Sequence, residues 1–203
     1  MRSDGQARSD AILDAALECF AKNGVVSTGI EDIRKRAKAS PSSMYHLFGG
    51  LEGILLALLV RTFTRLFAAL AADVARTKTA EAAVKALVRG QIDWVLANPL
   101  EARVMYQAMT LESSPKVMRP LADKKAELLR PLAAHFAPFV ERRELPRWDP
   151  LTFDVVVLGA THEAARRFLG GAPLDPAWMR RELPRMAWAS LPKTDKVGRG
   201  GSR

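Results

Sequence analysis

The sequence contains little of what covalent or metal chemistry requires. Its 203 residues include one cysteine, Cys19, and only three histidines, His46, His135 and His162. A single cysteine can form neither a disulfide framework nor a CxxC metal pair, which fits a reducing cytosol. No HExxH motif, GxSxG motif or phosphate-cradling glycine loop is present. We therefore expect no enzymatic activity, no metal site and no cofactor.

Signals for strands, secretion and membrane insertion are also weak. No stretch alternates apolar and polar residues, and β-branched runs are few, so we expect an all-α fold. The segment from Met1 to Asp10 lacks an apolar signal core. The most apolar region, Leu51 to Ala72, is interrupted by Glu52, Arg61 and Arg65. These features argue against a membrane span and favour a cytoplasmic protein.

Positive charge is in excess but is not concentrated at the N-terminus. The net charge is +9, yet residues 1–50 contain seven Lys/Arg against six Asp/Glu. A local basic cluster is formed by Arg34, Lys35, Arg36 and Lys38. Such a cluster is either a solvated helix face or an attraction for an acidic partner such as DNA.

Apolar residues recur at helical spacing, and glycines, prolines and capping residues interrupt them. These signals predict about nine helices. We expect them at about residues 7–23, 28–37, 41–49, 51–75, 79–97, 99–110, 115–139, 151–169 and 176–190. Pro120 and Pro131 should kink or divide the seventh helix, and Pro184 should kink the last one.

The first three helices are joined by short connections. Thr28, followed by Glu31, has the form of a capping box that begins the second helix. Ser40 and Pro41 have the residue types of an N-cap and a first helical position, so a third helix begins there. Only two residues separate the second helix from this cap, which predicts a helix-turn-helix corner.

The third helix has two different faces. Met44 and Phe48 share one face, which we expect to be buried. The opposite face and its edge carry Ser42, Ser43, Tyr45 and His46. Hydroxyls, an imidazole and a phenol suit contacts with bases and phosphates in a major groove. The alternative is that Tyr45 and His46 merely complete the surface of a small domain.

The order of residues from Ile12 to Leu55 resembles the N-terminal domain of the tetracycline-repressor (TetR) family. The matching positions are Ile-Leu-x-Ala-Ala-x-x-x-Phe at residues 12–20, Gly24, Thr28, Ile33, Ala37, Ser40, Tyr45, Phe48, Glu52, Ile54 and Leu55. The resemblance implies a repressor that binds a palindromic double-stranded DNA operator as a homodimer and is released by a small-molecule effector. The alternative is an effector-independent activator or architectural regulator that uses its C-terminal domain only to dimerise.

The resemblance also implies where the operator is contacted. Its contact positions fall on Thr28, Ser42, Ser43, Tyr45 and His46, with Tyr45 on a phosphate and Ser42, Ser43 and His46 facing bases. Two departures concern phosphates: Lys38 replaces the usual turn glycine, and Leu51 stands where a lysine often begins the fourth helix. We expect Lys38, Arg34 or Lys35 to supply the phosphate contact that Leu51 cannot make.

The remainder of the chain is expected to sense an effector. The resemblance implies a DNA-binding domain at residues 1–50 and an effector-binding and dimerisation domain at residues 51–191. Residues 192–203 form a basic tail without apolar anchors, which we expect to be disordered. The candidate effector contacts are Phe67, Trp94, Tyr106 and Met109, all of which could equally be ordinary core. Few acids lie near them, which favours an apolar or anionic effector over a multivalent cation.

The last two predicted helices have a composition suited to a homodimer. Gly159, Ala160 and Ala164 permit close helix approach. The candidate interface residues are Val155, Leu158, Gly159, Ala160, His162, Ala164, Met179, Leu183 and Met186. We expect both helices to pair with their symmetry mates as a four-helix bundle. The alternative is that they close the core of one subunit, with His162 as a core histidine.

Overall fold

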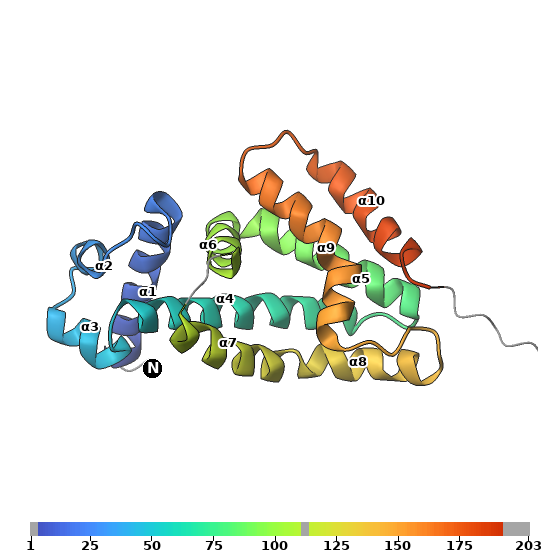
Figure 1. Ribbon diagram of the computed structural model, residues 1–203, viewed down its shortest axis with the longest axis horizontal. Helices are drawn as coiled ribbons and strands as arrows, with labels where there is room; N and C mark the ends of the chain where they lie inside the picture. Colours follow the sequence, from blue (N-terminus) through green and yellow to red (C-terminus); the bar gives the residue numbers. More distant parts are fainter. Residues whose placement is uncertain (1–3, 111–113, 193–203) are drawn as a thin grey trace, which may run out of the picture. The chain divides into compact units, whose positions relative to one another are not determined.

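The computed structural model describes residues 4–110 and 114–192, and these residues form ten α-helices and no strand (Figure 1). The all-α fold class is therefore confirmed. The helices are α1 (Asp4–Asn23), α2 (Ile30–Ala37), α3 (Pro41–Phe48), α4 (Leu51–Val74), α5 (Ala80–Ala97), α6 (Pro99–Thr110), α7 (Pro115–Leu128), α8 (Arg130–Glu141), α9 (Pro150–Leu169) and α10 (Pro176–Ala189). The predicted disorder of the basic tail concerns residues that lie, from 193 onward, outside the described part.

The predicted seventh helix is divided into α7 and α8, which gives ten described helices instead of nine. The break at Leu129 directly precedes the first turn of α8, which contains Pro131. Proline lacks the N–H that would continue the ladder, but it is tolerated in a first turn. Pro120 and Pro184 lie inside α7 and α10, and both helices continue past them.

The chain folds as two compact units, each made from segments distant in sequence. Unit 1 comprises residues 1–68 and 95–129, and unit 2 comprises residues 69–94 and 130–203. The helices α4 and α5 therefore contribute to both units. A division into domains at residue 50 remains a prediction.

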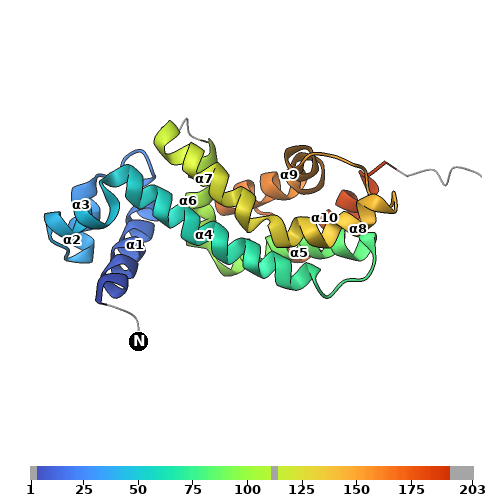
Figure 2. The ribbon, with the colours of Figure 1, turned by 90° about the horizontal axis from the view of Figure 1, so that it is seen from below.

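Unit 1 has an apolar core surrounded by ion pairs. Its helix α1 packs against α2 and α6. Figure 2 shows α1 beside α2 and α3. Ile12 and Phe20 of α1, Ile33 of α2 and Met44 of α3 are each at most 1% exposed. Each of the first three helices thus contributes apolar side chains to the core.

Three ion pairs each join two helices of unit 1, and we call them together the ion-pair ladder. Arg36 of α2 pairs with Glu18 of α1. One turn earlier on α1, Asp14 pairs with Arg61 of α4 at 2.8 Å. One turn further along α4, Arg65 pairs with Glu101 of α6 at 2.7 Å. The ladder thus joins α2 to α6 through α1 and α4.

Within unit 2, α9 packs against α10, and both helices have aspartate N-caps. The Asp149 carboxylate accepts hydrogen bonds from the backbone N–H groups of Leu151 and Thr152 at 3.0 Å each. The side-chain and backbone hydrogen bonds from Thr152 lower the pKa of the Asp149 carboxyl. The predicted start of α10 at Pro176 is confirmed, and α9 begins at Pro150, one residue before the predicted Leu151.

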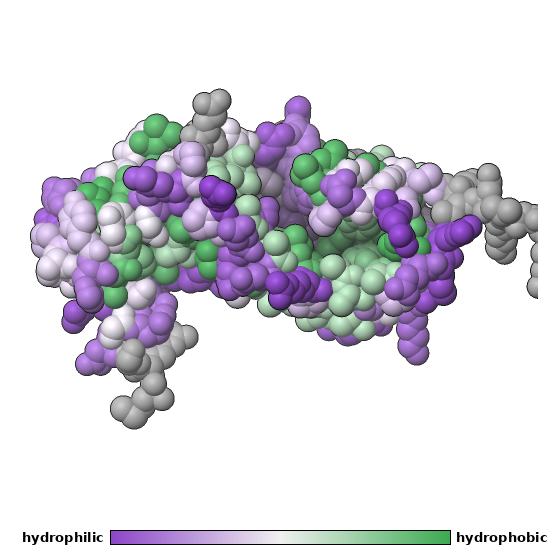
Figure 3. All heavy atoms as spheres, turned by 60° about the horizontal axis from the view of Figure 1, so that its bottom comes forward, coloured by the Kyte–Doolittle hydropathy of each residue, from purple (hydrophilic) through white to green (hydrophobic). Residues whose placement is uncertain are grey.

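Among the described residues, α4 is the one helix that is long and apolar enough to cross a membrane by length and composition. Core helices pass the same test. Leu58 and Leu59 of α4 are completely buried, and Arg61 reaches Asp14 of α1. The surface in Figure 3 mixes hydrophilic and hydrophobic residues. The contacts of α4 in unit 1 are those of a core helix.

Candidate nucleic-acid interface

The turn between α1 and α2 differs from the predicted capping box. Thr28 is only 2% exposed, and its hydroxyl donates a hydrogen bond to the Gly24 carbonyl oxygen at 2.7 Å. The N-cap of α2 is Gly29, whose N–H donates to the Asp32 carboxylate at 2.9 Å. The predicted N-cap at Thr28 is wrong, because its hydroxyl instead holds the turn. In this conformation that hydroxyl is too buried to reach a phosphate.

The boundaries of α3 follow from its own residues. The Ser40 hydroxyl accepts a hydrogen bond from the Ser43 N–H at 3.2 Å, and Pro41 occupies the first helical position. At the other end, Gly49 has a φ of 70° and donates its N–H to the Tyr45 carbonyl oxygen at 2.8 Å. A left-handed C-cap of this kind favours glycine. The predicted bounds of α3 are confirmed.

The two faces of α3 are separated as the helical wheel predicts. Met44 is 1% exposed and Phe48 is half-buried, so this side faces the core of unit 1. Tyr45 is 60% exposed, Ser42 and His46 are also exposed, and Ser43 is half-buried. We call Ser42, Ser43, Tyr45 and His46 the α3 polar face. It presents hydroxyls and an imidazole without requiring any change in the core.

The cations of α2 and the following turn fall into two groups. Arg34 pairs with Glu31 at 2.8 Å, and Arg36 pairs with Glu18. Lys35 and Lys38 are exposed and form no ion pair with another described residue. Two of the four positive charges are thus balanced within the chain, while the two lysines remain available to an anionic partner.

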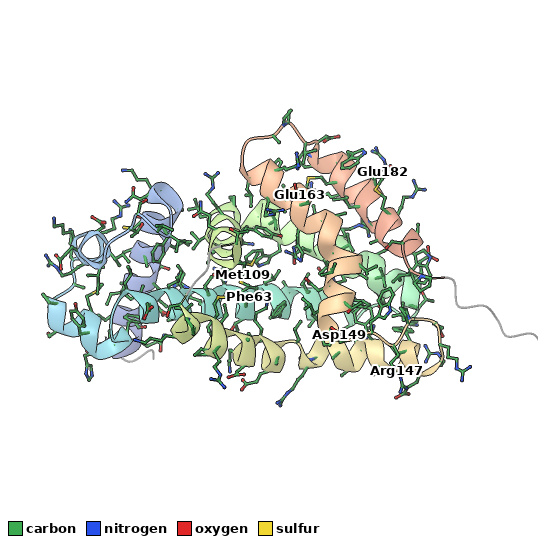
Figure 4. All side chains as sticks on the ribbon, in the orientation of Figure 1. Phe63, Met109, Arg147, Asp149, Glu163 and Glu182 are labelled. Carbon is green, nitrogen blue, oxygen red and sulfur yellow. The ribbon has the colours of Figure 1, made fainter. Side chains whose placement is uncertain are left out.

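The effector candidates do not all lie in one unit. Phe67, Tyr106 and Met109 belong to unit 1, whereas Trp94 is buried in unit 2. Phe67 stacks on Phe63, with 5.5 Å between ring centroids. Figure 4 labels Phe63 on α4 and Met109 on α6. Three of the four predicted residues therefore belong to unit 1, Trp94 is the last residue of its segment of unit 2, and their role as effector contacts stays a prediction.

Two polar features near these helices had no clear signal in the sequence. The ammonium of Lys125 lies 4.6 Å from the centre of the Phe63 ring. The side-chain oxygen of Gln107 in α6 is buried and accepts no hydrogen bond from the described residues. In a sequence, a glutamine or a lysine within a helix usually indicates a solvent-exposed position. Only the packing of unit 1 shows that the Gln107 oxygen is buried and that Lys125 lies over an aromatic ring.

The interface candidates divide into accessible and buried residues. Val155 and Met186 are 61% and 54% exposed, Ala160 is exposed, and Gly159 and His162 are partly exposed. The buried ones are Leu158, Ala164, Met179 and Leu183. These four are covered within a single chain, so they are less accessible to a second copy, and the dimer interface stays a prediction. Sequence analysis missed Leu151, which is 72% exposed one turn before Val155 on α9.

His162 is not a fully buried core histidine. Its side chain is 28% exposed, and its Nε2 atom lies 3.4 Å from the Asp154 carboxylate. It therefore remains a candidate for contact with a second subunit.

Two comparisons of sequence find similarity to bacterial regulators. Residues 12–58 match the family model described as bacterial regulatory proteins, tetR family. The chain is also similar to YobS of Bacillus subtilis (strain 168), an uncharacterized HTH-type transcriptional regulator, with 32% identity over 88 residues. That alignment covers 43% of this chain and 46% of YobS, so the chain spans about half the length of this curated relative.

Solved structures share the fold over most of the chain. A TetR family transcription regulator from Marinobacter aquaeolei VT8 has a TM-score of 0.73 and 19% identity, covering 94% of this chain and 98% of that one. The transcriptional regulator FadR from Bacillus subtilis, solved in complex with stearoyl-CoA, has a TM-score of 0.71 and 17% identity, covering 89% and 97%. The helix-turn-helix segment therefore matches the tetR family of bacterial regulatory proteins, and the described helices have the fold of solved TetR-family regulators.

Proposed function

We propose that this protein is a cytoplasmic repressor that binds a palindromic DNA operator as a homodimer and is released by a small-molecule effector. The observation that carries the proposal is the α3 polar face, which is exposed while Met44 on the other side of the helix is buried, together with the exposed Lys35 of α2, which forms no ion pair with another described residue. Exposed groups on a capped helix at a helix-turn-helix corner suit major-groove contacts. The similar proteins named above are regulators, which supports regulation over catalysis.

An operator with two symmetric half-sites is the expected target. Selection from random duplexes should enrich a pseudo-palindrome whose half-sites lie about one helical turn apart or slightly more. Affinity for the selected duplex should fall steeply with salt, because bound phosphates release counterions. Enrichment of single, unsymmetric sites, or of none, would contradict the repressor proposal.

Homodimerisation is supported by the exposed apolar residues of unit 2. Leu151 and Val155 lie one turn apart on α9, and Met186 is exposed on α10. Exposed apolar side chains on two helices that pack together favour burial against a partner. A second copy of the same helices is the partner that a palindromic operator requires.

An effector that is apolar or anionic fits the features of unit 1. Phe63 and Phe67 offer aromatic surface, Lys125 offers a positive charge, and the Gln107 oxygen offers an unused acceptor. A buried acceptor without a donor costs about 1–3 kcal/mol, which a ligand donor would recover. The FadR neighbour holds stearoyl-CoA, which makes acyl compounds the first ligands to test. The ion-pair ladder and the α1–α6 packing provide physical contact between α6 and the helix-turn-helix.

A thermal-shift screen of long-chain fatty acids and acyl-CoA esters should find ligands that raise the melting temperature. Each such ligand should also weaken binding to the selected operator by about 5- to 150-fold, the range of ordinary coupling free energies. Operator binding measured with and without ligand checks this. Ligands that stabilise the protein without changing operator affinity would instead support the effector-independent alternative.

A further inference from the structure

In the described part of the chain, three helices end in the same backbone pattern. A residue in the left-handed conformation donates its N–H to the carbonyl oxygen three residues earlier, and the next residue donates to the carbonyl oxygen five residues earlier. This pattern is a Schellman motif, in which the left-handed residue is usually glycine. After α9 that residue is Gly171, with a φ of 92°. After α2 and α8 it is Lys38 and Arg143, with φ values of 50° and 58°.

A side chain at these two positions is unfavourable for the backbone. In the left-handed region the Cβ atom approaches the following carbonyl oxygen, which glycine avoids. At Lys38 a glycine would therefore make the same two hydrogen bonds, at 3.3 Å from Lys38 and 3.1 Å from Ala39, with less strain. The lysine side chain contributes nothing visible to the fold, because it is exposed and forms no ion pair with a described residue.

Lys38 lies at a place where a positive charge favours the binding of a phosphate. Lys38 lies two residues before Ser40, the N-cap of α3. Backbone N–H groups at the start of a recognition helix attract phosphates, and a nearby ammonium adds to this attraction. The other cations close to the corner are less available, since Arg34 is held by Glu31 and also donates to the Ala39 carbonyl oxygen at 3.5 Å. Leu51, at the start of α4, carries no charge.

We propose that Lys38 binds an operator phosphate at the corner between α2 and α3, and that the chain carries lysine in a glycine position for this contact. The proposal rests on the proposed function, because it requires that the α3 polar face meets DNA. It predicts that folding and DNA binding respond in opposite directions to glycine at this position.

Four variants separate the backbone from the charge. Lys38→Gly removes both the strain and the charge, Lys38→Gln removes only the charge, and Lys38→Arg keeps both. Arg143→Gly is the matched control, since it removes one positive charge from the same motif in unit 2, where none of the α3 polar face lies. Melting temperature and affinity for the selected operator are measured for each variant over a series of KCl concentrations.

The expected results differ among the variants. Lys38→Gly should raise the melting temperature by about 2 °C, as should Arg143→Gly. Lys38→Gly and Lys38→Gln should both weaken operator binding by roughly fivefold per half-site, and should reduce the salt slope by about one per half-site. Lys38→Arg should retain operator affinity, and Arg143→Gly should leave affinity and slope unchanged.

Two results would overturn the phosphate contact while leaving the proposed function intact. One is wild-type operator affinity and salt slope in Lys38→Gln. The other is an equal loss of affinity in Lys38→Gly and Arg143→Gly, which would show an effect of net charge alone. Failure of the wild-type protein to bind any duplex would overturn the proposed function, and the contact with it.

Discussion

Arginine in place of Val155 is expected to convert the protein into a folded monomer with weak operator binding. Val155 is 61% exposed, so the substitution does not disturb the core of unit 2. In a two-fold dimer the new charge would be desolvated against the same apolar face of the second copy. Loss of the second half-site should then reduce operator affinity by at least about 100-fold, because bivalent binding gains that much from effective concentration.

Sedimentation of the Val155→Arg protein measures this directly. Val26→Arg is the matched control, since Val26 is an exposed valine in the turn between α1 and α2 and the variant should stay dimeric. Ala164 is unsuitable for such a test, because it is buried within unit 2 and a charge there would disrupt folding. A dimer that survives Val155→Arg would show that the interface lies elsewhere.

Removing Tyr45 and His46 together should abolish most operator binding without affecting stability. Both side chains are exposed on α3, so their truncation to alanine leaves the packing of Met44 and Phe48 intact. A good base contact contributes about 1–3 kcal/mol of discrimination, so the double variant should bind at least about tenfold more weakly. Operator titration and thermal melting of the same preparation provide the two readouts.

Met44→Ala supplies the contrast for this experiment. Its side chain is 1% exposed, and its truncation should cost about 2–5 kcal/mol of folding free energy. Any loss of DNA binding in Met44→Ala should accompany unfolding, whereas the Tyr45 and His46 variant should lose binding while folded. Wild-type operator affinity in that double variant would exclude the α3 polar face as the DNA-binding surface.

The sequence predicted α3 well because α3 is determined by residues within or next to it. Ser40 and Gly49 set its ends, and its short length leaves little doubt about which face holds Met44. The fold class followed from similar local patterns. By contrast, the N-cap of α2 was misplaced because Gly29 has no side chain to signal a cap, and its partner Asp32 is one residue beyond the expected Glu31.

Contacts between distant segments could not be predicted in this way. The apolar stripe of α9 indicated which residues avoid water, but not whether α10 of the same subunit or a second copy covers them. Leu158 and Ala164 are covered within a single chain, whereas Val155 is exposed. The pairing of Arg36 with Glu18 likewise depends on the packing of α1 against α2, so the basic cluster could not be divided into paired and unpaired charges.

The ion-pair ladder has an evolutionary consequence. Its first rung, between Arg36 and Glu18, lies at the surface of unit 1, and an exposed ion pair contributes at most about 1 kcal/mol to stability. A point mutation can therefore reverse or delete one rung without endangering the folded state. If the ladder contributes to the response to an effector, single substitutions can strengthen, weaken or remove that response in descendants of this gene. The fold and the α3 polar face would stay the same.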